Sequence, residues 1–385
     1  MRRRVRPALA LSCAVLLGAC TTTLGDAAPE PAEPDREGSQ QAPDDRTGRP
    51  DSITVLGTGD ILLHPDLTEQ AARDASTTGR GERDFRPLLA GVEPLVSDAD
   101  LAICHLEVPL AEQGGPFSGW PSFNAPPEIA DALAATGYDT CSTASNHTLD
   151  QGEDGVVRTL DALDGNGIEH AGSARTEQEA ASPTVIDVDG VGVAHLSYTF
   201  GFNGLQLPQG KEWLADKLDH EAIVEEAALA RENGAEIVVA SLHWGREYEH
   251  VPSPAQRELA ERLLEAGAVD LILGHHAHVV QSIDRVGERW VAYGLGNHVA
   301  RHAEPRGTTE EGIAARFEFT HTDDGWVAET AEYIPTLVDL DEPIRLVDLT
   351  TADPTPRREE ALERTDGAVL GDGAAAHGLT RPGRE

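Results

Sequence analysis

The sequence predicts an α/β fold in which β-sheets and helices pack as layers. Short apolar runs alternate with helical patterns through the first two thirds of the chain, and strands predominate after that. In addition, polar side chains recur directly after predicted strands, which is where open α/β sheets place their ligand sites. The predicted strands cover residues 53–57, 101–106, 138–142, 184–188, 191–198, 237–242, 271–273, 279–285, 289–294, 314–320 and 326–334. The predicted helices cover residues 87–96, 126–135, 152–163, 219–233 and 254–266.

Several of these elements carry signals at their ends. Pro126-Pro127 stands where a helix begins, because proline fits the first turn, and Gly137 stands where that helix ends. Asp219 is a helix-capping residue, and Gly234 marks the end of the helix that it opens. Asp189-Gly190 separates two apolar runs and predicts a β-hairpin.

The size and charge of the chain limit its function. It has 385 residues and a formal net charge of −37 at pH 7. Once the two ends are set aside, about 300 residues remain, enough for one large domain or two small ones. A nucleic-acid-binding protein needs a basic face, so this charge argues against nucleic acid as a partner. It argues equally against electrostatic adhesion to anionic lipid.

The N-terminus has the pattern of a bacterial lipoprotein signal. Four arginines precede an apolar run at residues 8–17, which is too short to span a bilayer. Leu17-Gly18-Ala19-Cys20 follows and resembles a lipobox, whose cysteine is acylated and becomes the first residue of the mature protein. An ordinary secretory signal with an incidental cysteine is the alternative. We expect residues 1–19 to be a signal peptide and Cys20 to hold the protein on the extracytoplasmic face of the cell membrane.

The composition predicts three further segments. Residues 20–51 contain almost no large apolar side chain and are expected to form a disordered tether. Residues 52–350 are expected to form the folded domain, and the charged segment 351–385 a disordered tail. Within the domain, Cys104 and Cys141 form a disulfide or remain as two buried thiols, and the sequence leaves both alternatives open.

Residues of the kinds that bind metal follow five of the predicted strands. Alternation along a strand places His105 and Glu107 on one side and Leu106 on the other. Each position alone fits a structural role, such as a turn, a helix cap or a surface histidine cluster. Five such positions at strand ends are better explained by a common site. The candidate metal ligands are Asp60, His64, Glu107, Asn146, His243, His276 and His278.

The chemistry of these groups narrows the choice of metal. A mixture of carboxylate, amide oxygen and imidazole suits Mn, Fe or Zn better than Ca or Mg. The ligands suffice for two divalent ions, and a two-metal centre can activate water and stabilise an oxyanion. His147, beside a candidate ligand, is placed to donate a proton to a leaving group.

Several motifs resemble the CapA/PgsA family of capsule (poly-γ-glutamate) proteins. They are Phe123-Asn124-Ala125-Pro126-Pro127-Glu128, Ser145-Asn146-His147-Thr148-Leu149-Asp150, His243-Trp244-Gly245-Arg246-Glu247-Tyr248, Gly274-His275-His276-Ala277-His278 and Tyr293-Gly294-Leu295-Gly296-Asn297. The resemblance spans about residues 52–300. It implies a calcineurin-like metallophosphatase fold, a four-layer sandwich of two mixed sheets flanked by helices. It also places Asp60, Glu107, Asn146, His243, His276 and His278 at metal-ligand positions and His147 at the proton-donor position.

The sequence departs from the family pattern in places. His105 stands where the family commonly has Asn, Asn124 where it often has Arg, and His298 where it often has Phe. Metallophosphatases have one residue between the first Asp and His, whereas three separate Asp60 from His64.

Two functions fit these features. The first is a metal-dependent hydrolase that cleaves a phosphoester or an amide, with or without a link to capsule. The second is a non-catalytic accessory protein that binds an anionic polymer during capsule synthesis or export, with capsule synthetase subunits as partners. A structural metal protein is a third option. Trp244, Glu247 and Asn297 are candidate substrate-binding residues, although Trp244 fits core packing equally well.

Overall fold

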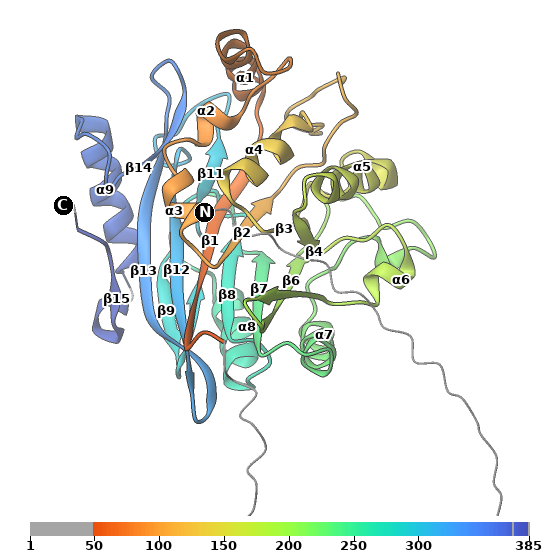
Figure 1. Cartoon of the computed structure of the whole chain (residues 1–385), viewed down its shortest axis with the longest axis vertical. Coiled ribbons are helices and arrows are strands. Elements are labelled where there is room, and N and C mark those ends of the chain that lie inside the picture. Colours follow the sequence, from red (N-terminus) through yellow and green to blue (C-terminus); the bar gives the residue numbers. More distant parts are fainter. Residues whose placement is uncertain (1–48, 372, 384–385) are drawn as a thin grey trace, which may run out of the picture. The chain divides into compact units, whose positions relative to one another are not determined.

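A computed structural model describes residues 49–371 and 373–383. In this part of the chain two β-sheets face one another, with helices on their outer faces (Figure 1). This arrangement confirms the predicted α/β class with two mixed sheets flanked by helices. The predicted signal peptide, Cys20 and most of the predicted tether lie outside the described residues. No helix in the described ranges is long and apolar enough to cross a bilayer.

The first sheet is built around β1 (Ser52–Leu62). Parallel strands extend from one side of β1, in the order β2, β3, β4, and antiparallel strands extend from the other, in the order β12, β13, β14. These elements and two short additions are β2 (Leu101–Leu106), β3 (Thr140–Ser142), β4 (Glu169–Ala171), β11 (Asn297–Ala300), β12 (Glu311–Thr322), β13 (Gly325–Asp339), β14 (Arg345–Asp348) and β15 (Leu379–Thr380).

The second sheet has a parallel centre and an antiparallel strand at each edge. Its strands, in sheet order, are β5 (Thr184–Val188), β6 (Val191–Thr199), β7 (Ile237–His243), β8 (Leu271–His275), β10 (Arg289–Ala292) and β9 (Ile283–Val286). Strands β5 and β6 pair as the hairpin that Asp189-Gly190 predicts.

Helices complete the outer layers. They are α1 (Pro65–Thr78), α2 (Arg86–Leu89), α3 (Glu93–Ser97), α4 (Glu128–Thr136), α5 (Gly152–Gly165), α6 (Glu177–Ala180), α7 (His220–Glu232), α8 (Pro254–Glu265) and α9 (Pro356–Val369), with the 3₁₀ turns η1 (Glu212–Leu214) and η2 (Ala374–His377). As predicted, the Asp219 side chain caps α7 by accepting from the backbone N–H of Ala222, and Gly137 ends α4 in the left-handed region.

Three apolar layers hold these elements together. The cluster between the sheets contains side chains from both, such as Ile103 and Val239. A second cluster joins the first sheet to α1–α4, and a third joins the second sheet to α7 and α8. Burial of these side chains stabilises the fold by about 25 cal/mol for each Å² of apolar surface removed from water. Each sheet therefore has packed apolar side chains on both of its faces, and these hold the strand ends that carry the polar residues in place.

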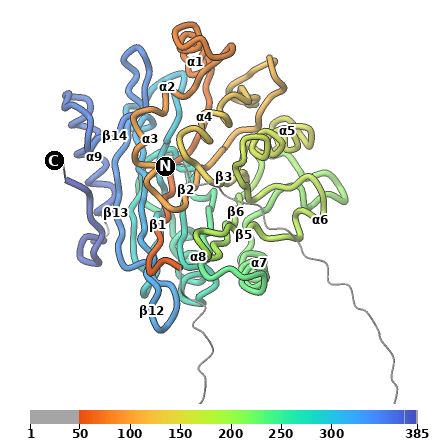
Figure 2. Tube along the Cα trace, viewed as in Figure 1, coloured from red at the N-terminus to blue at the C-terminus, as the bar shows by residue number. Residues whose placement is uncertain are grey.

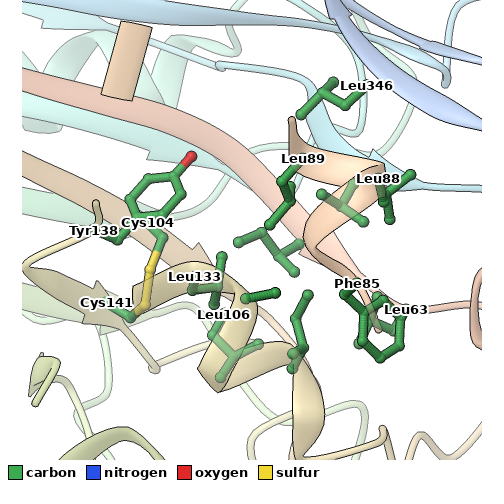
Figure 3. Packing of buried hydrophobic residues seen from close by; sticks show 14 of the residues in the cluster. Leu63, Phe85, Leu88, Leu89, Cys104, Leu106, Leu133, Tyr138, Cys141 and Leu346 are labelled. Carbon is green, nitrogen blue, oxygen red and sulfur yellow. A yellow bond between two sulfur atoms is a disulfide. The ribbon is translucent and has the colours of Figure 1, made fainter. Parts of the chain in front are cut away.

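The two cysteines of the domain form a disulfide and are not free thiols. Cys104 and Cys141 are register partners on β2 and β3 and are bonded to each other. Figure 3 shows them beside Leu106, Leu133 and other side chains of the cluster under α2 and α4.

The structure differs from the prediction at two helical regions. The helix expected over residues 87–96 is divided into α2 and α3. The prediction of a disordered tail over residues 351–385 is wrong for its middle part, because α9 lies there beside β13 and β14 (Figure 2). Charged residues dominate α9, but Ala361, Thr365 and Val369 form a narrow buried stripe along it. Such a small apolar face gives a weak hydrophobic signal in the sequence.

Candidate metal centre

The carboxyl ends of the parallel strands bring the predicted ligands together. In the first sheet, Asp60 of β1 is the register partner of His105 on β2. In the second sheet, His243 of β7 is the register partner of His275 on β8. Because the sheets face one another, side chains from these ends meet in the buried layer between them.

The backbone at two of these ends requires glycine. A Cβ on Gly59 would lie 2.2 Å from the carbonyl oxygen of Gly296, and one on Gly274 would lie 1.9 Å from that of Tyr293. Both contacts are shorter than any side chain tolerates, so only glycine permits this approach. After Gly274 the chain turns sharply, and His276 and His278 adopt positive φ angles of 85° and 55°. Such a backbone is uncommon for histidine and is typical of functional turns.

Asp60 anchors that histidine turn. Its Oδ1 accepts from Nδ1 of His275 at 3.1 Å, and its Oδ2 accepts from the backbone N–H of His276 at 3.2 Å. Nδ1 of His278 is also 3.2 Å from Oδ2. Burial opposes ionisation of Asp60, but the hydrogen bonds from His275 and His278 hold its pKa well below the usual value. Asp60 is therefore a carboxylate.

Glu107 lies next to this group without a hydrogen-bond partner. Both of its side-chain oxygens are buried, and no donor in the described part of the chain reaches either of them. The nearest is Nε2 of His278, 3.7 Å from Oε1. Burial raises the pKa of Glu107 to about 7, against the opposing effect of His278. Burial would lower the pKa of His278, but the charge of Glu107 and the bond to Asp60 raise it to about 10. Without a cation, a proton on His278 balances these carboxylates.

Asn146 and His243 form the other half of the centre. Oδ1 of Asn146 is 3.1 Å from Nε2 of His243, and its Nδ2 donates to Oδ1 of Asn203 at 3.3 Å. The centroid of the His276 ring lies 4.7 Å from that of the His243 ring, and its buried Nδ1 has no hydrogen-bond partner among the described residues. Burial lowers the pKa of both imidazoles, so they are neutral and can offer lone pairs to a cation.

Within residues 49–371 and 373–383, three sets of side chains bring their ligand atoms within 4.8 Å of one another, as a metal site requires. Asp60, Glu107 and His278 form the first, and all three are buried. Together with the unpaired oxygens of Glu107 and the unpaired Nδ1 of His276, this geometry fits divalent cations. The other two sets are Asp60, His105 and His275, and Glu247, His276 and His278.

His147 lies at the edge of the centre and is held by a carboxylate. Its Nδ1 donates to Oδ2 of Asp150 at 2.7 Å, and the same oxygen accepts from the backbone N–H of Phe123 at 2.7 Å. The His147 ring packs edge-on against Phe123. These contacts fix the imidazole and leave Nε2 as its remaining polar atom.

The structure reassigns two predicted substrate-binding residues. Trp244 is 2% exposed, packs in the cluster under α7 and α8, and donates from Nε1 to the carbonyl of Tyr293, so core packing is the correct alternative. Asn297 is also buried. Its Nδ2 donates to the carbonyl of Thr309 at 2.7 Å, and its Oδ1 accepts from Nδ1 of His278 at 3.0 Å. Asn297 therefore orients a candidate ligand and leaves Nε2 of that ring for a cation.

The other two predicted site residues, Glu247 and His64, differ in their relation to the ligand sets. Glu247 is exposed and lies next to His276 and His278, where it can contact either a cation or a substrate. His64 belongs to none of the ligand sets, and its Nδ1 is bonded to the carbonyl of Leu62 at 2.9 Å.

Four residues of the site are not among the predicted metal ligands, catalytic residue or substrate-binding residues. Asp150, three positions after His147, could have been found from that spacing. His275 belongs to the predicted histidine turn, but nothing in the sequence shows that it bonds to Asp60. His105 contacts His243 only because the sheets pack face to face, whereas Phe200 reaches His243 from the end of β6, the neighbouring strand in the same sheet. Phe200, 43% exposed, lies 4.6 Å from the His276 ring at the solvent side.

Solved structures that align with this chain include, by title, a phosphoesterase and a 5′-nucleotidase precursor. A calcineurin-like phosphoesterase, YfkN, from Bacillus subtilis aligns with a TM-score of 0.40 and 15% identity over 83% of this chain and 98% of that one. A 5′-nucleotidase precursor from Thermus thermophilus aligns with a TM-score of 0.41 and 16% identity over 83% of this chain and 59% of that one.

Similarity in sequence identifies the family. The family described as "Bacterial capsule synthesis protein PGA_cap" matches residues 54–302. The capsule biosynthesis protein CapA of Bacillus anthracis is 30% identical over 256 residues, which is 65% of this chain and 60% of that relative. The PGA biosynthesis protein CapA of Bacillus subtilis is 27% identical over 275 residues, 68% of this chain and 67% of the relative. The chain therefore belongs to the PGA_cap family of bacterial capsule synthesis proteins.

Proposed function

We propose that this protein is a metal-dependent hydrolase of capsule polymer synthesis or export. Its substrate class is an amide bond of an anionic polymer such as poly-γ-glutamate, or a phosphoester formed during synthesis of the polymer. The observation that carries the proposal is Glu107, whose buried carboxyl group has no hydrogen-bond donor within the described residues and lies 3.7 Å from the imidazole of His278. A buried group left in this state costs several kcal/mol unless a cation accompanies it.

The proposed centre holds two divalent cations, with Mn, Fe or Zn suited to the ligand set. The ligands are Asp60, Glu107, Asn146, His243, His276 and His278. When bound, such cations make water a better nucleophile near neutral pH and stabilise negative charge in the transition state. Protons must leave His278 and Glu107 before the cations bind, so metal affinity rises with pH.

His147 and Asp150 supply the proton of the proposed reaction. The 2.7 Å bond from Nδ1 to the Asp150 carboxylate fixes the orientation of the His147 ring. In the protonated imidazole, Nε2 is a donor at the edge of the centre, and it can protonate the leaving group as the bond breaks. The backbone N–H of Phe123 keeps the carboxylate in place throughout.

An arginine near the candidate centre supports an anionic substrate. The Arg306 guanidinium lies 3.9 Å from the Tyr248 ring centroid, and that ring is 6.1 Å from His278. A positive group beside the centre attracts a carboxylate or phosphate despite the acidity of the whole chain. The proposed location on the outer face of the membrane rests on Cys20 and the apolar run before it.

A polymer-binding accessory role without turnover is the second candidate. A Mycobacterium tuberculosis relative, 27% identical over 287 residues, carries the name of a polyglutamine synthesis accessory protein. Only an assay of turnover separates this role from hydrolysis, because both use the same metal centre.

The test combines metal content with turnover. The purified full-length protein is analysed for Mn, Fe and Zn, and is then assayed on a phosphodiester, a phosphomonoester and poly-γ-glutamate. We expect bound metal and cleavage of at least one substrate. Bound metal without any turnover would favour the accessory role, and absence of metal after reconstitution would refute the centre.

Two variants assign the roles. His147→Ala should lower kcat by roughly 10²–10⁴-fold at unchanged metal content, as loss of a general acid does. His276→Ala should lower metal affinity about tenfold or more, and it removes no internal hydrogen bond of the ring Nδ1. His377→Ala, at an exposed position outside the centre, is the control. Unchanged kcat in the first variant would remove His147 from the mechanism.

A further inference from the structure

His105 joins the two sheets directly behind the candidate metal centre. It lies on β2, two residues after Ile103 of the inter-sheet core, and its ring is fully buried. Its Nε2 is 3.0 Å from Nδ1 of His243 on β7, in the other sheet. We propose that His105 is a positioning residue that fixes the ring orientation and the tautomer of His243. This inference rests on the proposed metal centre.

A chain of hydrogen bonds assigns the protons. Because a carbonyl can only accept, we assign the Oγ proton of Ser142 to the carbonyl of Cys104 at 3.2 Å, so that Oγ accepts from Nδ1–H of His105 at 2.8 Å. Nε2 of His105 then carries a lone pair and accepts from Nδ1–H of His243. As a result, Nε2 of His243 carries a lone pair as well, and it faces Oδ1 of Asn146 at 3.1 Å. Two acceptors at this distance repel each other unless a cation lies between them.

Packing keeps the His105 ring in the required plane. It stacks on His275 with the ring centroids 4.0 Å apart and an interplanar angle of 19°. Both ring nitrogens of His105 are already bonded, so this ring serves a ligand and is not itself free to be one. Ligand histidines commonly depend on such a second hydrogen bond for their orientation and basicity.

A second histidine in the same layer offers a matched control. His195 on β6 is also fully buried and also bridges the sheets, from Oγ1 of Thr140 at 2.9 Å to Oγ of Ser241 at 3.0 Å. None of its hydrogen bonds goes to a candidate ligand. Loss of His195 should therefore disturb the packing between the sheets as much as loss of His105, without disturbing His243.

The first experiment measures metal affinity in full-length variants, by titration with Mn²⁺ or Zn²⁺ against a competing chelator. His105→Leu should bind about 10–100-fold more weakly than wild type. His105→Gln offers a carbonyl oxygen of similar reach and should recover most of the loss. His195→Leu should keep wild-type affinity. Wild-type affinity in His105→Leu, or an equal loss in His195→Leu, would overturn the proposal.

The second experiment needs no variant of His105. In metal-free protein labelled with ¹⁵N-histidine, long-range ¹H–¹⁵N spectra report the tautomer of each ring, and His243→Gln assigns the signal. A proton on Nδ1 of His243 is the expected result, and a proton on Nε2 would refute the inference. If wild-type protein binds no divalent cation, the proposed function fails, whereas this tautomer still decides the role of His105.

Discussion

The buried carboxylate of Glu311 offers a quantitative test of how α9 is attached to the domain. Glu311 begins β12, and its side chain is 3% exposed. Its Oε1 accepts from Arg357 at 2.7 Å and from Arg364 at 2.7 Å, and its Oε2 accepts from Arg364 at 2.9 Å. Both arginines belong to α9, so one carboxylate holds the helix at two points.

We expect Glu311→Gln to lower the free energy of unfolding by about 2–3 kcal/mol. A hydrogen bond to a charged group contributes about 1.5–3 kcal/mol, and loss of one partner of a buried ion pair costs about 3–5 kcal/mol. Three bonds are affected, but they share one carboxylate and do not add. The side chains of Arg357 and Arg364 are 36% and 32% exposed, so solvent screening reduces the effect. Glutamine also retains one acceptor oxygen.

Equilibrium unfolding in urea measures this difference. The control is Glu360→Gln, because Glu360 pairs with the same Arg364 at 3.2 Å but is 63% exposed. An exposed pair contributes about 0–1 kcal/mol, so the control should unfold close to wild type. If the two variants lost the same amount of stability, the attachment of α9 through Glu311 would be refuted.

Three further predictions concern other parts of the structure. Asn297→Ala should weaken metal binding about 10–100-fold, because the imidazole of His278 loses its orienting acceptor. Asn297→Asp should bind metal nearly as well as wild type. Equal metal affinity of Asn297→Ala and wild type in chelator competition would contradict this prediction. Replacing Cys104 and Cys141 with alanine should lower stability in urea by about 3–4 kcal/mol, given their separation of 37 residues; a loss below about 1 kcal/mol would argue against the disulfide. Burial, with a smaller contribution from Glu226, raises the pKa of Asp216 to about 7, so the folded protein binds this proton more tightly than the unfolded chain. Stability should then fall as pH rises from about 4 to about 7, and Asp216→Asn should flatten that fall in thermal unfolding; an unchanged pH profile would contradict it.

Local sequence signals predicted much of the fold. Strands β2 and β5 have their predicted bounds, and most other predicted strands and helices are present with shifted ends. These elements carry apolar runs, caps and glycine stops within a few residues of one another. The tail helix α9 escaped prediction because its attachment depends on Glu311, far from it in the sequence. A two-residue strand such as β15 has too few residues for any period to be visible.

For the candidate site, the sequence by itself determined which kinds of residue stand at the strand ends, because strand periodicity and glycine turns are local properties. Only the tertiary structure decided which atoms meet. His105 reaches His243 across 138 residues of chain, and Trp244 turns into the core while its neighbour His243 faces Asn146. These contacts depend on how the two sheets pack face to face, at a particular distance and alignment. No pattern within a single strand contains that information.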